Sequence, residues 1–188
     1  MIDASALSEK PVLSGSRIRL APLSIRHAAA FHATTLDPET RRLTGTHRRF
    51  TLEDIRAWCS GRADQKDRLD LAIEDLETGD YLGDLALLGV DADNAHGVLR
   101  IALVPGATDR GIGTEAIRLL LDHAFDRVRL HRVQLEVFAF NDRARRAYER
   151  CGFEVEGRMR EALAWDGEWH DVLMMAALSS ARPTTGAR

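Results

Sequence analysis

Residues 101–153 read IALVPGATDRGIGTEAIRLLLDHAFDRVRLHRVQLEVFAFNDRARRAYERCGF, and this stretch decides the fold. A strand is predicted from Val98 to Val104, and Pro105-Gly106 ends it. The glycine turn Arg110-Gly111-Ile112-Gly113-Thr114 then opens a predicted helix, Ile112 to Arg129, whose charged residues recur on one face. Free N–H groups and the positive dipole end at such a turn favour a phosphate, unless the turn serves only to start the helix.

A strand and a short helix complete this stretch. The strand, Arg132 to Phe140, places Glu136 on the same face as two phenylalanines. Asn141-Asp142 then forms a helix N-cap, and the helix that follows carries Tyr148 in its apolar stripe before Gly152 ends it. The sequence therefore predicts strand, glycine turn, helix, strand and helix in that order.

This arrangement resembles the GNAT superfamily of acetyl-CoA-dependent N-acetyltransferases. The residues that match its last helix are Asn141, Ala144, Tyr148, Gly152 and Phe153. The continuation from Phe153 to Leu178 resembles the branch that includes the ribosomal-protein N-terminal acetyltransferases and the spermidine acetyltransferases, and Tyr81-Leu82-Gly83-Asp84-Leu85 fits the third strand of that branch. The resemblance covers roughly residues 16–178.

The resemblance implies a single α/β (α+β) domain with a mixed, mostly antiparallel sheet of about seven strands and helices on both faces. We expect the domain to occupy residues 14–178, after a flexible leader of residues 1–13 and before a disordered tail of residues 179–188. Asp37 to Phe50 is polar and predicted to be irregular, and the resemblance places it beside the acceptor site. The remaining predicted strands are Ser16–Pro22, Leu69–Glu74, Tyr81–Leu88, Phe153–Leu163 and Glu168–Leu178, and the remaining predicted helices are Ser24–Thr35 and Thr51–Gly61.

Two side chains are candidates for proton transfer. Tyr148 matches the general acid of the superfamily, and the alternative is a core tyrosine whose hydroxyl is tied to a carbonyl. Glu136 is the candidate base, as in the resembling N-terminal alanine acetyltransferases, and the alternative is a strand carboxylate paired with an arginine.

The resemblance also assigns a site for acetyl-CoA. Gly111 and Gly113 would cradle its pyrophosphate, and Arg110 and Thr114 would add contacts. The pantetheine arm would meet Asn141 and the backbone groups of Leu103 and Val104. One position departs from the superfamily pattern, because Thr108 stands where Arg or Gln is usual.

The chain is thus expected to be an N-acetyltransferase that uses acetyl-CoA and acts on a primary amine by direct attack, with a protein N-terminus as the favoured acceptor. A polyamine or aminoglycoside acetyltransferase and a non-catalytic acyl-CoA sensor are the alternatives. Residues 51–96 carry 12 acidic and 4 basic side chains, a balance compatible with attracting a cationic amine.

Composition and spacing exclude several other classes. Histidines and the two cysteines lack metal-ligand spacing, so no metal is expected. No apolar run approaches the ~20 residues of a membrane span, and a cytoplasmic location without nucleic-acid or membrane partners is the default. Aromatic residues in the last hairpin make a homodimer plausible.

Overall fold

A computed structural model describes residues 2–181 of the chain. Its eight strands form one sheet in the order β1-β2-β3-β4-β5-β6-β8-β7, and only the β5–β6 pair is parallel. The fold class is the expected one, and the strand beyond the seven is the two-residue β1. The strands are β1 (Leu13–Ser14), β2 (Ile18–Pro22), β3 (Leu69–Asp75), β4 (Tyr81–Asp91), β5 (His96–Leu103), β6 (Arg132–Phe138), β7 (Glu154–Trp165) and β8 (Glu168–Leu178).

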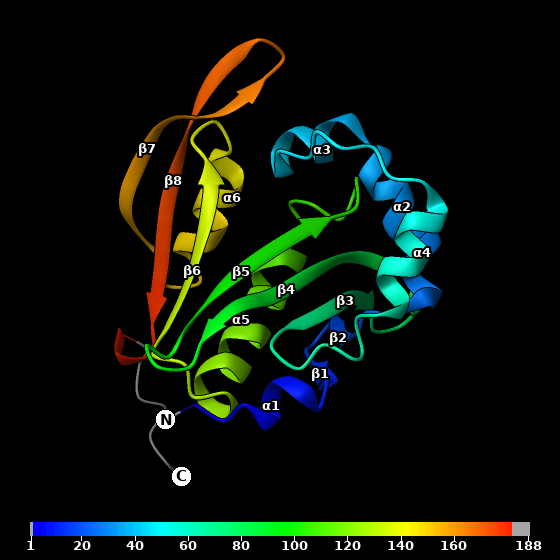
Figure 1. The fold of residues 1–188 in the computed structure, drawn as a ribbon, viewed down its shortest axis with the longest axis vertical. Coiled ribbons are helices and arrows are strands. Elements are labelled where there is room, and N and C mark those ends of the chain that lie inside the picture. Colours follow the sequence, from blue (N-terminus) through cyan, green and yellow to red (C-terminus); the bar gives the residue numbers. More distant parts are fainter. Residues whose placement is uncertain (1, 182–188) are drawn as a thin grey trace.

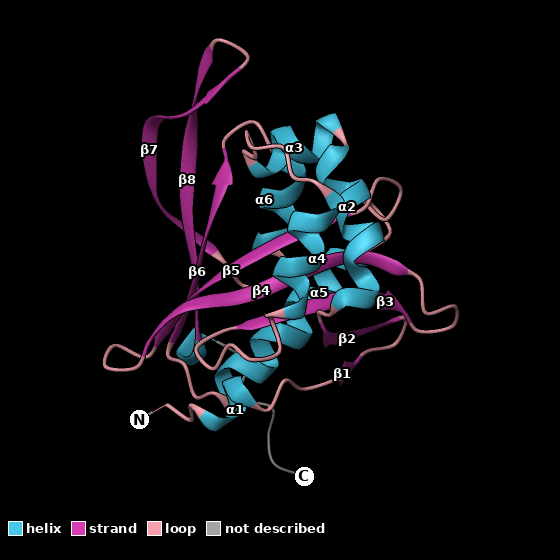
Figure 2. Ribbon diagram, turned by 45° about the vertical axis from the view of Figure 1, so that its right-hand side comes forward, coloured by secondary structure: helices cyan, strands magenta, loops and turns pink. Residues whose placement is uncertain are grey.

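Helices cover both faces of this sheet (Figure 2). Strand alternation explains the two layers, because Leu71 and Ile73 of β3 lie in the core with α5, whereas Ala72 between them packs with α2 and α4. No helix of the described chain is long and apolar enough to cross a membrane. The helices are α1 (Ser5–Ser8), η1 (Ile25–His27), α2 (Ala28–Leu36), α3 (Pro38–Thr44), α4 (Leu52–Ser60), α5 (Ile112–Asp122), the π-helix η2 (His123–Arg127), α6 (Asp142–Glu149) and η3 (Ser179–Ala181).

The parallel strands β5 and β6 pair only at their starts. Their paired residues are His96–Val98 on β5 and Arg132–Gln134 on β6, after which the two strands diverge (Figure 1). Beyond the divergence β5 stays paired with β4 and β6 with β8. A gap therefore opens in the middle of the sheet, next to the glycine turn that follows β5.

The described residues of the predicted leader, 2–13, are not loose, which corrects the expectation for them. The side chain of Leu7 is 2% exposed and belongs to the main core. The Asp3 amide donates to the Val128 carbonyl at 2.8 Å, and His123 Nε2 lies 3.1 Å from the Ala6 carbonyl oxygen. This segment packs against η2 and Val128, at the end of the helix that begins with α5. The amino-acid composition of the segment does not indicate this packing. Of the predicted tail, residues 179–181 form η3, and residues 182–188 lie outside the described part.

The segment from Asp37 to Phe50 contains a helix that the sequence pattern did not predict. Asp37 caps α3 by accepting a hydrogen bond from the Thr40 amide at 2.7 Å, and Pro38 occupies the first helical turn. Gly45, in the left-handed conformation, ends the helix. The prediction was wrong because the segment lacks apolar periodicity, although these start and stop signals were present.

The buried N-terminal segment makes a stability prediction. Leu7→Ala should lower the free energy of unfolding by about 2–5 kcal/mol, because it leaves a cavity in the core. The same truncation at Val12, which is 60% exposed, should change it by less than about 0.5 kcal/mol. Urea unfolding of both variants measures the difference, and equal small effects would show that residues 1–13 do not contribute to the core.

Candidate active site

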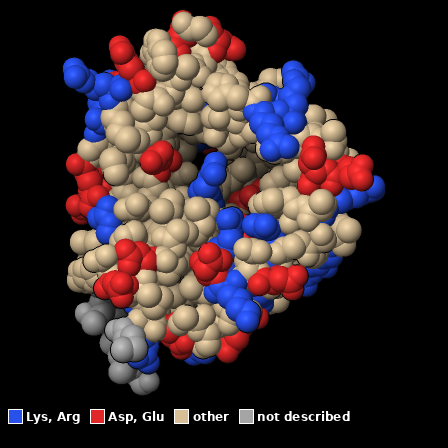
Figure 3. Space-filling model, in the orientation of Figure 1, with Lys and Arg blue, Asp and Glu red and all other residues tan. Residues whose placement is uncertain are grey.

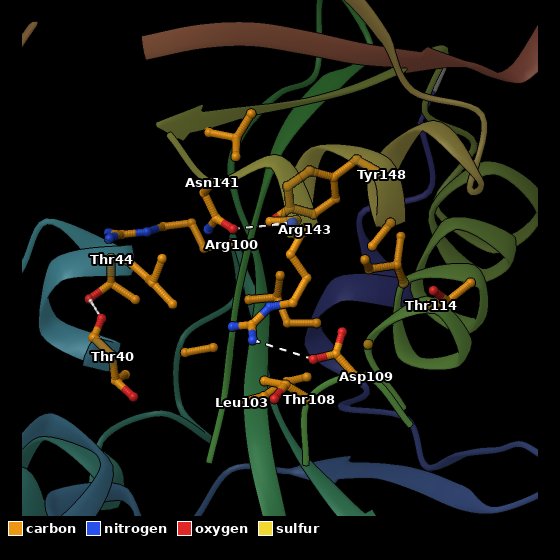
Figure 4. A pocket seen from close by; sticks show the side chains of 18 of the residues that line it. Thr40, Thr44, Arg100, Leu103, Thr108, Asp109, Thr114, Asn141, Arg143 and Tyr148 are labelled. Carbon is orange, nitrogen blue, oxygen red and sulfur yellow. Dashed lines mark hydrogen bonds and ion pairs between the residues drawn. The ribbon is translucent and has the colours of Figure 1, made fainter. Parts of the chain in front are cut away.

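A cavity of about 680 Å³ occupies the gap between the diverging strands. Figure 4 shows Thr40 and Thr44 of α3 on one side of it, and Tyr148 of α6 and Thr114 of α5 on the other. The predicted site residues that line the cavity are Leu103, Val104, Gly111, Gly113, Thr114, Glu136, Asn141 and Tyr148. The fold thus brings together residues from β5, α5, β6 and α6.

The glycine turn lies at the N-terminus of α5. Gly111 is the N-cap residue, with φ of 76°, and no side chain caps its helix. The turn is fixed from behind by Arg17, whose guanidinium donates to the Arg110 carbonyl at 2.6 Å and pairs with Glu115 at 3.1 Å. The first N–H groups of α5 are therefore held in place at the cavity wall without a side-chain cap, as an anion site requires.

The Arg110 side chain, by contrast, does not line the cavity. Three other arginines do, Arg100, Arg143 and Arg150. The Arg143 guanidinium lies 3.8 Å from the Glu39 carboxylate. It lies 3.6 Å from the carboxylate of Asp109, a pair marked by a dashed line in Figure 4. Arg143 thus faces the cavity from α6.

The backbone of β5 offers polar groups to the same cavity. Val104 is already engaged, because its amide donates to the Leu82 carbonyl at 3.0 Å and its carbonyl accepts from the Ala107 amide at 3.1 Å. Successive residues of a strand direct their N–H and C=O groups to opposite sides. The groups of Leu103 therefore face the gap that β6 has left, so Leu103 is the better candidate for a backbone contact with a ligand.

Tyr148 is buried in the wall formed by α6. Its ring lies 5.9 Å from the ring of Phe153, and burial raises the pKa of Tyr148 to about 12. Within the described residues its hydroxyl has no protein hydrogen-bond partner, unlike a core tyrosine tied to a carbonyl. The hydroxyl is therefore protonated at neutral pH and free to donate to a ligand in the cavity.

Glu136 reaches the cavity from β6 and is exposed. It has no ion-pair partner among the described residues, in contrast to Glu156, which Arg132 binds at 2.5 Å on the neighbouring part of the sheet. Asn141 lies further along and caps α6, since its Oδ1 accepts from the Ala144 amide at 3.1 Å. Its side-chain NH₂ group is left to face the cavity.

A second cavity of about 490 Å³ adjoins the first and is lined in part by the segment from Asp37 to Phe50, which the sequence analysis expected beside an acceptor site. The two cavities share Thr40, Thr44, Arg100, Ile101 and Ala102. The walls of the second include Phe31, Phe50 and Trp58, and its floor includes Asp84 of β4. Figure 3 shows the molecule hollowed near its middle, with basic side chains at the edge of the hollow.

Asp84 is a carboxylate without a cationic partner within ion-pair distance in the described chain. It accepts a hydrogen bond from the Tyr81 hydroxyl at 2.8 Å, and burial raises its pKa to about 7. A clue in the sequence was its position, a single acidic residue inside the apolar run of β4. A carboxyl that titrates near neutral pH can hold an amine or exchange a proton with it.

The raised pKa of Asp84 makes a pH prediction. Between about pH 4 and pH 7 the folded protein should bind more protons at this site than the unfolded chain does, so its contribution to stability is lost as pH rises. The free energy of unfolding of the wild type should therefore fall with pH relative to that of Asp84→Asn, which keeps the Tyr81 contact. Urea unfolding at several pH values measures the difference, and parallel curves for the two proteins would contradict the shift.

Comparison with known proteins identifies the family of the domain. The acetyltransferase (GNAT) domain matches residues 17–154. A probable N-acetyltransferase YjcK of Bacillus subtilis is 34% identical over 50% of this chain and 46% of its own length. A spermidine N(1)-acetyltransferase of Vibrio cholerae is 29% identical over 57% of this chain and 62% of its own length. The chain thus spans about half to three fifths of these relatives.

Solved structures match over more of the chain. Mycobacterium smegmatis RimJ in complex with CoA-disulfide has a TM-score of 0.82 and 26% identity, covering 95% of this chain and 92% of its own. The spermidine N-acetyltransferase of Vibrio cholerae with CoA and spermine has a TM-score of 0.82 at 21% identity, covering 88% and 98% of the two chains, and supports the fold alone. With the domain match and the glycine turn in its expected place, the chain belongs to the GNAT family of acetyltransferases.

Proposed function

We propose that this protein transfers an acetyl group from acetyl-CoA to a primary amine, preferably a protein N-terminus. One observation carries the proposal: the cavity between β5 and β6 has an uncapped helix N-terminus at one part of its wall and a free tyrosine hydroxyl at another. The first suits the phosphates of CoA and the second suits a departing thiolate.

The residues present fit acetyl-CoA in the orientation expected for the family. The pyrophosphate would lie against Gly111 and Gly113, with Arg143 and Arg150 able to add positive charge. The free backbone groups of Leu103 would bind the pantetheine arm, and Asn141 would contact it from the other wall. Thr108, which replaces the usual Arg or Gln, also lines the cavity and can donate only a hydroxyl there.

The reaction needs a base and an acid. An alkyl ammonium with a pKa near ~10.4 is protonated at neutral pH, so a base must take its proton before the nitrogen attacks the thioester carbonyl. Glu136 is the proposed base. After the attack the nitrogen would lose a further proton to solvent, and collapse of the tetrahedral oxyanion breaks the carbon–sulfur bond. Tyr148 would give its proton to the CoA thiolate and regain one from solvent. The amide and free CoA are the products.

The nature of the relatives supports a protein N-terminus as the acceptor. RimJ is among the structural neighbours, and a putative ribosomal N-acetyltransferase YdaF of Bacillus subtilis is 30% identical over 55% of this chain. Spermidine acetyltransferases are also among the relatives, so a polyamine is the second candidate. The direct test is mass spectrometry of peptides with different first residues, and of spermidine, after incubation with acetyl-CoA. Acetylation of spermidine alone would contradict the N-terminus as acceptor.

The proposed base makes a kinetic prediction. Glu136→Gln should lower kcat about 100-fold, since proton abstraction of this kind contributes about 10²–10⁴-fold. Glu154→Gln, an exposed change on β7 away from the cavity, is the matched control and should leave kcat unchanged. Steady-state kinetics with saturating acetyl-CoA measures the difference, and an unaltered kcat in Glu136→Gln would assign the base elsewhere, with Asp84 as the next candidate.

A further inference from the structure

The second cavity has a surplus of positive charge. We infer that it selects an acceptor whose amine is accompanied by a carboxylate a few bonds away, an inference that rests on the proposed function. Such an acceptor can be a peptide with an acidic residue next to its N-terminal residue, or a free amino acid with its α-carboxylate. Both present the same pair of charges to the cavity.

Three arginines line this cavity without a carboxylate partner among the described residues: Arg41, Arg48 and Arg100. Arg41 Nη2 donates to the His47 carbonyl at 2.8 Å, and Arg41 Nη1 is buried with no hydrogen-bond partner in the described chain. Arg48 lies over the Phe50 ring at 5.0 Å. A buried guanidinium N–H without an acceptor is unfavourable, and a ligand carboxylate would satisfy it.

The acidic residues of the cavity are mostly engaged. Asp70 is held by Arg68, whose Nη2 and Nε lie 2.6 and 2.7 Å from its carboxylate oxygens. Asp54 accepts from the Thr51 amide at 2.9 Å as part of the cap of α4. Asp84 has no ion pair in the described chain; burial raises its pKa, and the charge of Arg100 lowers it. The lining thus carries four arginines, Arg41, Arg48, Arg68 and Arg100, against three aspartates, a surplus of one positive charge when Asp84 is ionised.

The positions of Asp84 and Arg100 suit a ligand with both charges. Across the β4–β5 ladder, Asp84 is opposite Ala102 and Arg100 is opposite Ala86. The side chains of Asp84 and Arg100 therefore lie on the same face of the sheet, as diagonal neighbours on adjacent strands. An ammonium group at Asp84 would lie next to Ala102, whose segment of β5 belongs to both cavities. Its carboxylate would then meet the arginines. A polyamine would bring further positive charges toward them and be disfavoured.

Matched acceptors test this charge preference. Peptides that begin Ser-Glu, Ser-Gln and Ser-Lys and are otherwise identical, free glutamate, and spermidine are compared by kcat/KM with acetyl-CoA, and by equilibrium binding to the protein saturated with CoA. We expect the Ser-Glu peptide to exceed the Ser-Lys peptide by about tenfold or more in both measurements, as for a charge pair at a partly buried interface. Preference for free glutamate over every peptide would identify the α-carboxylate as the source of the anion.

Arginine variants locate the origin of the preference. Arg41→Gln and Arg48→Gln should each reduce the Ser-Glu to Ser-Lys ratio about threefold or more, whereas Arg41→Lys should retain most of it. Arg49→Gln removes an exposed neighbour that does not line the cavity, and should leave the ratio unchanged. Thermal unfolding of each variant verifies that it is folded.

Two failures are distinguishable. If no acceptor is acetylated, the proposed function fails, but the binding measurements still decide the charge preference. If acetylation occurs and the Ser-Lys peptide or spermidine is used as well as the Ser-Glu peptide, the proposed function stands and the charge preference is overturned. Survival of an unchanged preference in both Arg41→Gln and Arg48→Gln would also overturn the role of these arginines as its source.

Discussion

Replacing Tyr148 by phenylalanine is expected to lower kcat for acetyl transfer about 100-fold or more. The variant retains the ring that packs against Phe153 and loses only a hydroxyl that has no protein hydrogen-bond partner among the described residues. The thermal midpoint should therefore stay within about 2 °C of the wild type, because no buried polar group is left unpaired. The KM for acetyl-CoA should change little, since the hydroxyl acts on the leaving thiolate rather than on the bound ground state.

The leaving group offers a control for this variant. A thioester whose thiol has a lower pKa than that of CoA needs less help from a proton donor, so it should be affected less by Tyr148→Phe. Unchanged turnover with acetyl-CoA would rule out Tyr148 as the acid. A fall that is equal for both thioesters would assign the hydroxyl to positioning the substrate.

Gly83→Ala is expected to give the largest loss of stability of any single methyl group added to this fold. Gly83 has φ of 150°, and an added Cβ would lie 2.3 Å from the Ala102 carbonyl oxygen and 2.9 Å from the Leu103 Cα. Those backbone atoms cannot move without separating β4 from β5. We expect the free energy of unfolding to fall by about 3 kcal/mol, as the strained backbone and the overlap add. Acetyl-CoA binding should weaken too, because Leu103 lines the cofactor cavity.

Gly79→Ala is the matched control. Gly79 also has a positive φ, of 76°, but no atom lies within 4 Å of an added Cβ. The cost there should be about 1 kcal/mol, from the left-handed conformation alone. Chemical denaturation separates the two, and equal losses at Gly79 and Gly83 would show that the close approach of β4 to β5 is unimportant.

The central part of the chain was predictable because its signals are local. The glycine turn, the cap at Asn141 and the position of Tyr148 are set by residues within a few positions of each other, and the structure places them around one cavity. The divergence of β5 from β6 could not be predicted from the sequence of either strand. It follows from the pairing of each strand with a different neighbour, β4 and β8, which depends on the whole sheet.

The features that the sequence did not predict depend on contacts between distant residues. Leu7 is core because it belongs to a cluster that also includes residues more than a hundred positions away, such as Leu120 and Ala124. The acidic balance of residues 51–96 suggested a site for cations, yet several of those acids serve other purposes, Asp54 in a cap and Asp70 in an ion pair with Arg68. Charge counts along the chain do not reveal which charges remain unpaired in a cavity. Arg41 and Arg48 come from a different segment of the chain. With them, the net charge of the lining of the second cavity is positive, whereas the acidic balance of residues 51–96 suggested a negative one.

Binding of acetyl-CoA in the cavity between β5 and β6 is the central claim. Calorimetric titration of the purified protein with acetyl-CoA tests it most directly, with ATP and NAD as controls for general affinity toward nucleotide phosphates. We expect saturable binding of one acetyl-CoA per chain in the micromolar range, and at least about tenfold weaker binding of ATP and NAD, which lack the pantetheine arm that Leu103 and Asn141 would contact. No binding of acetyl-CoA or of longer acyl-CoAs would contradict the claim, and would mean that the glycine turn serves only to start α5.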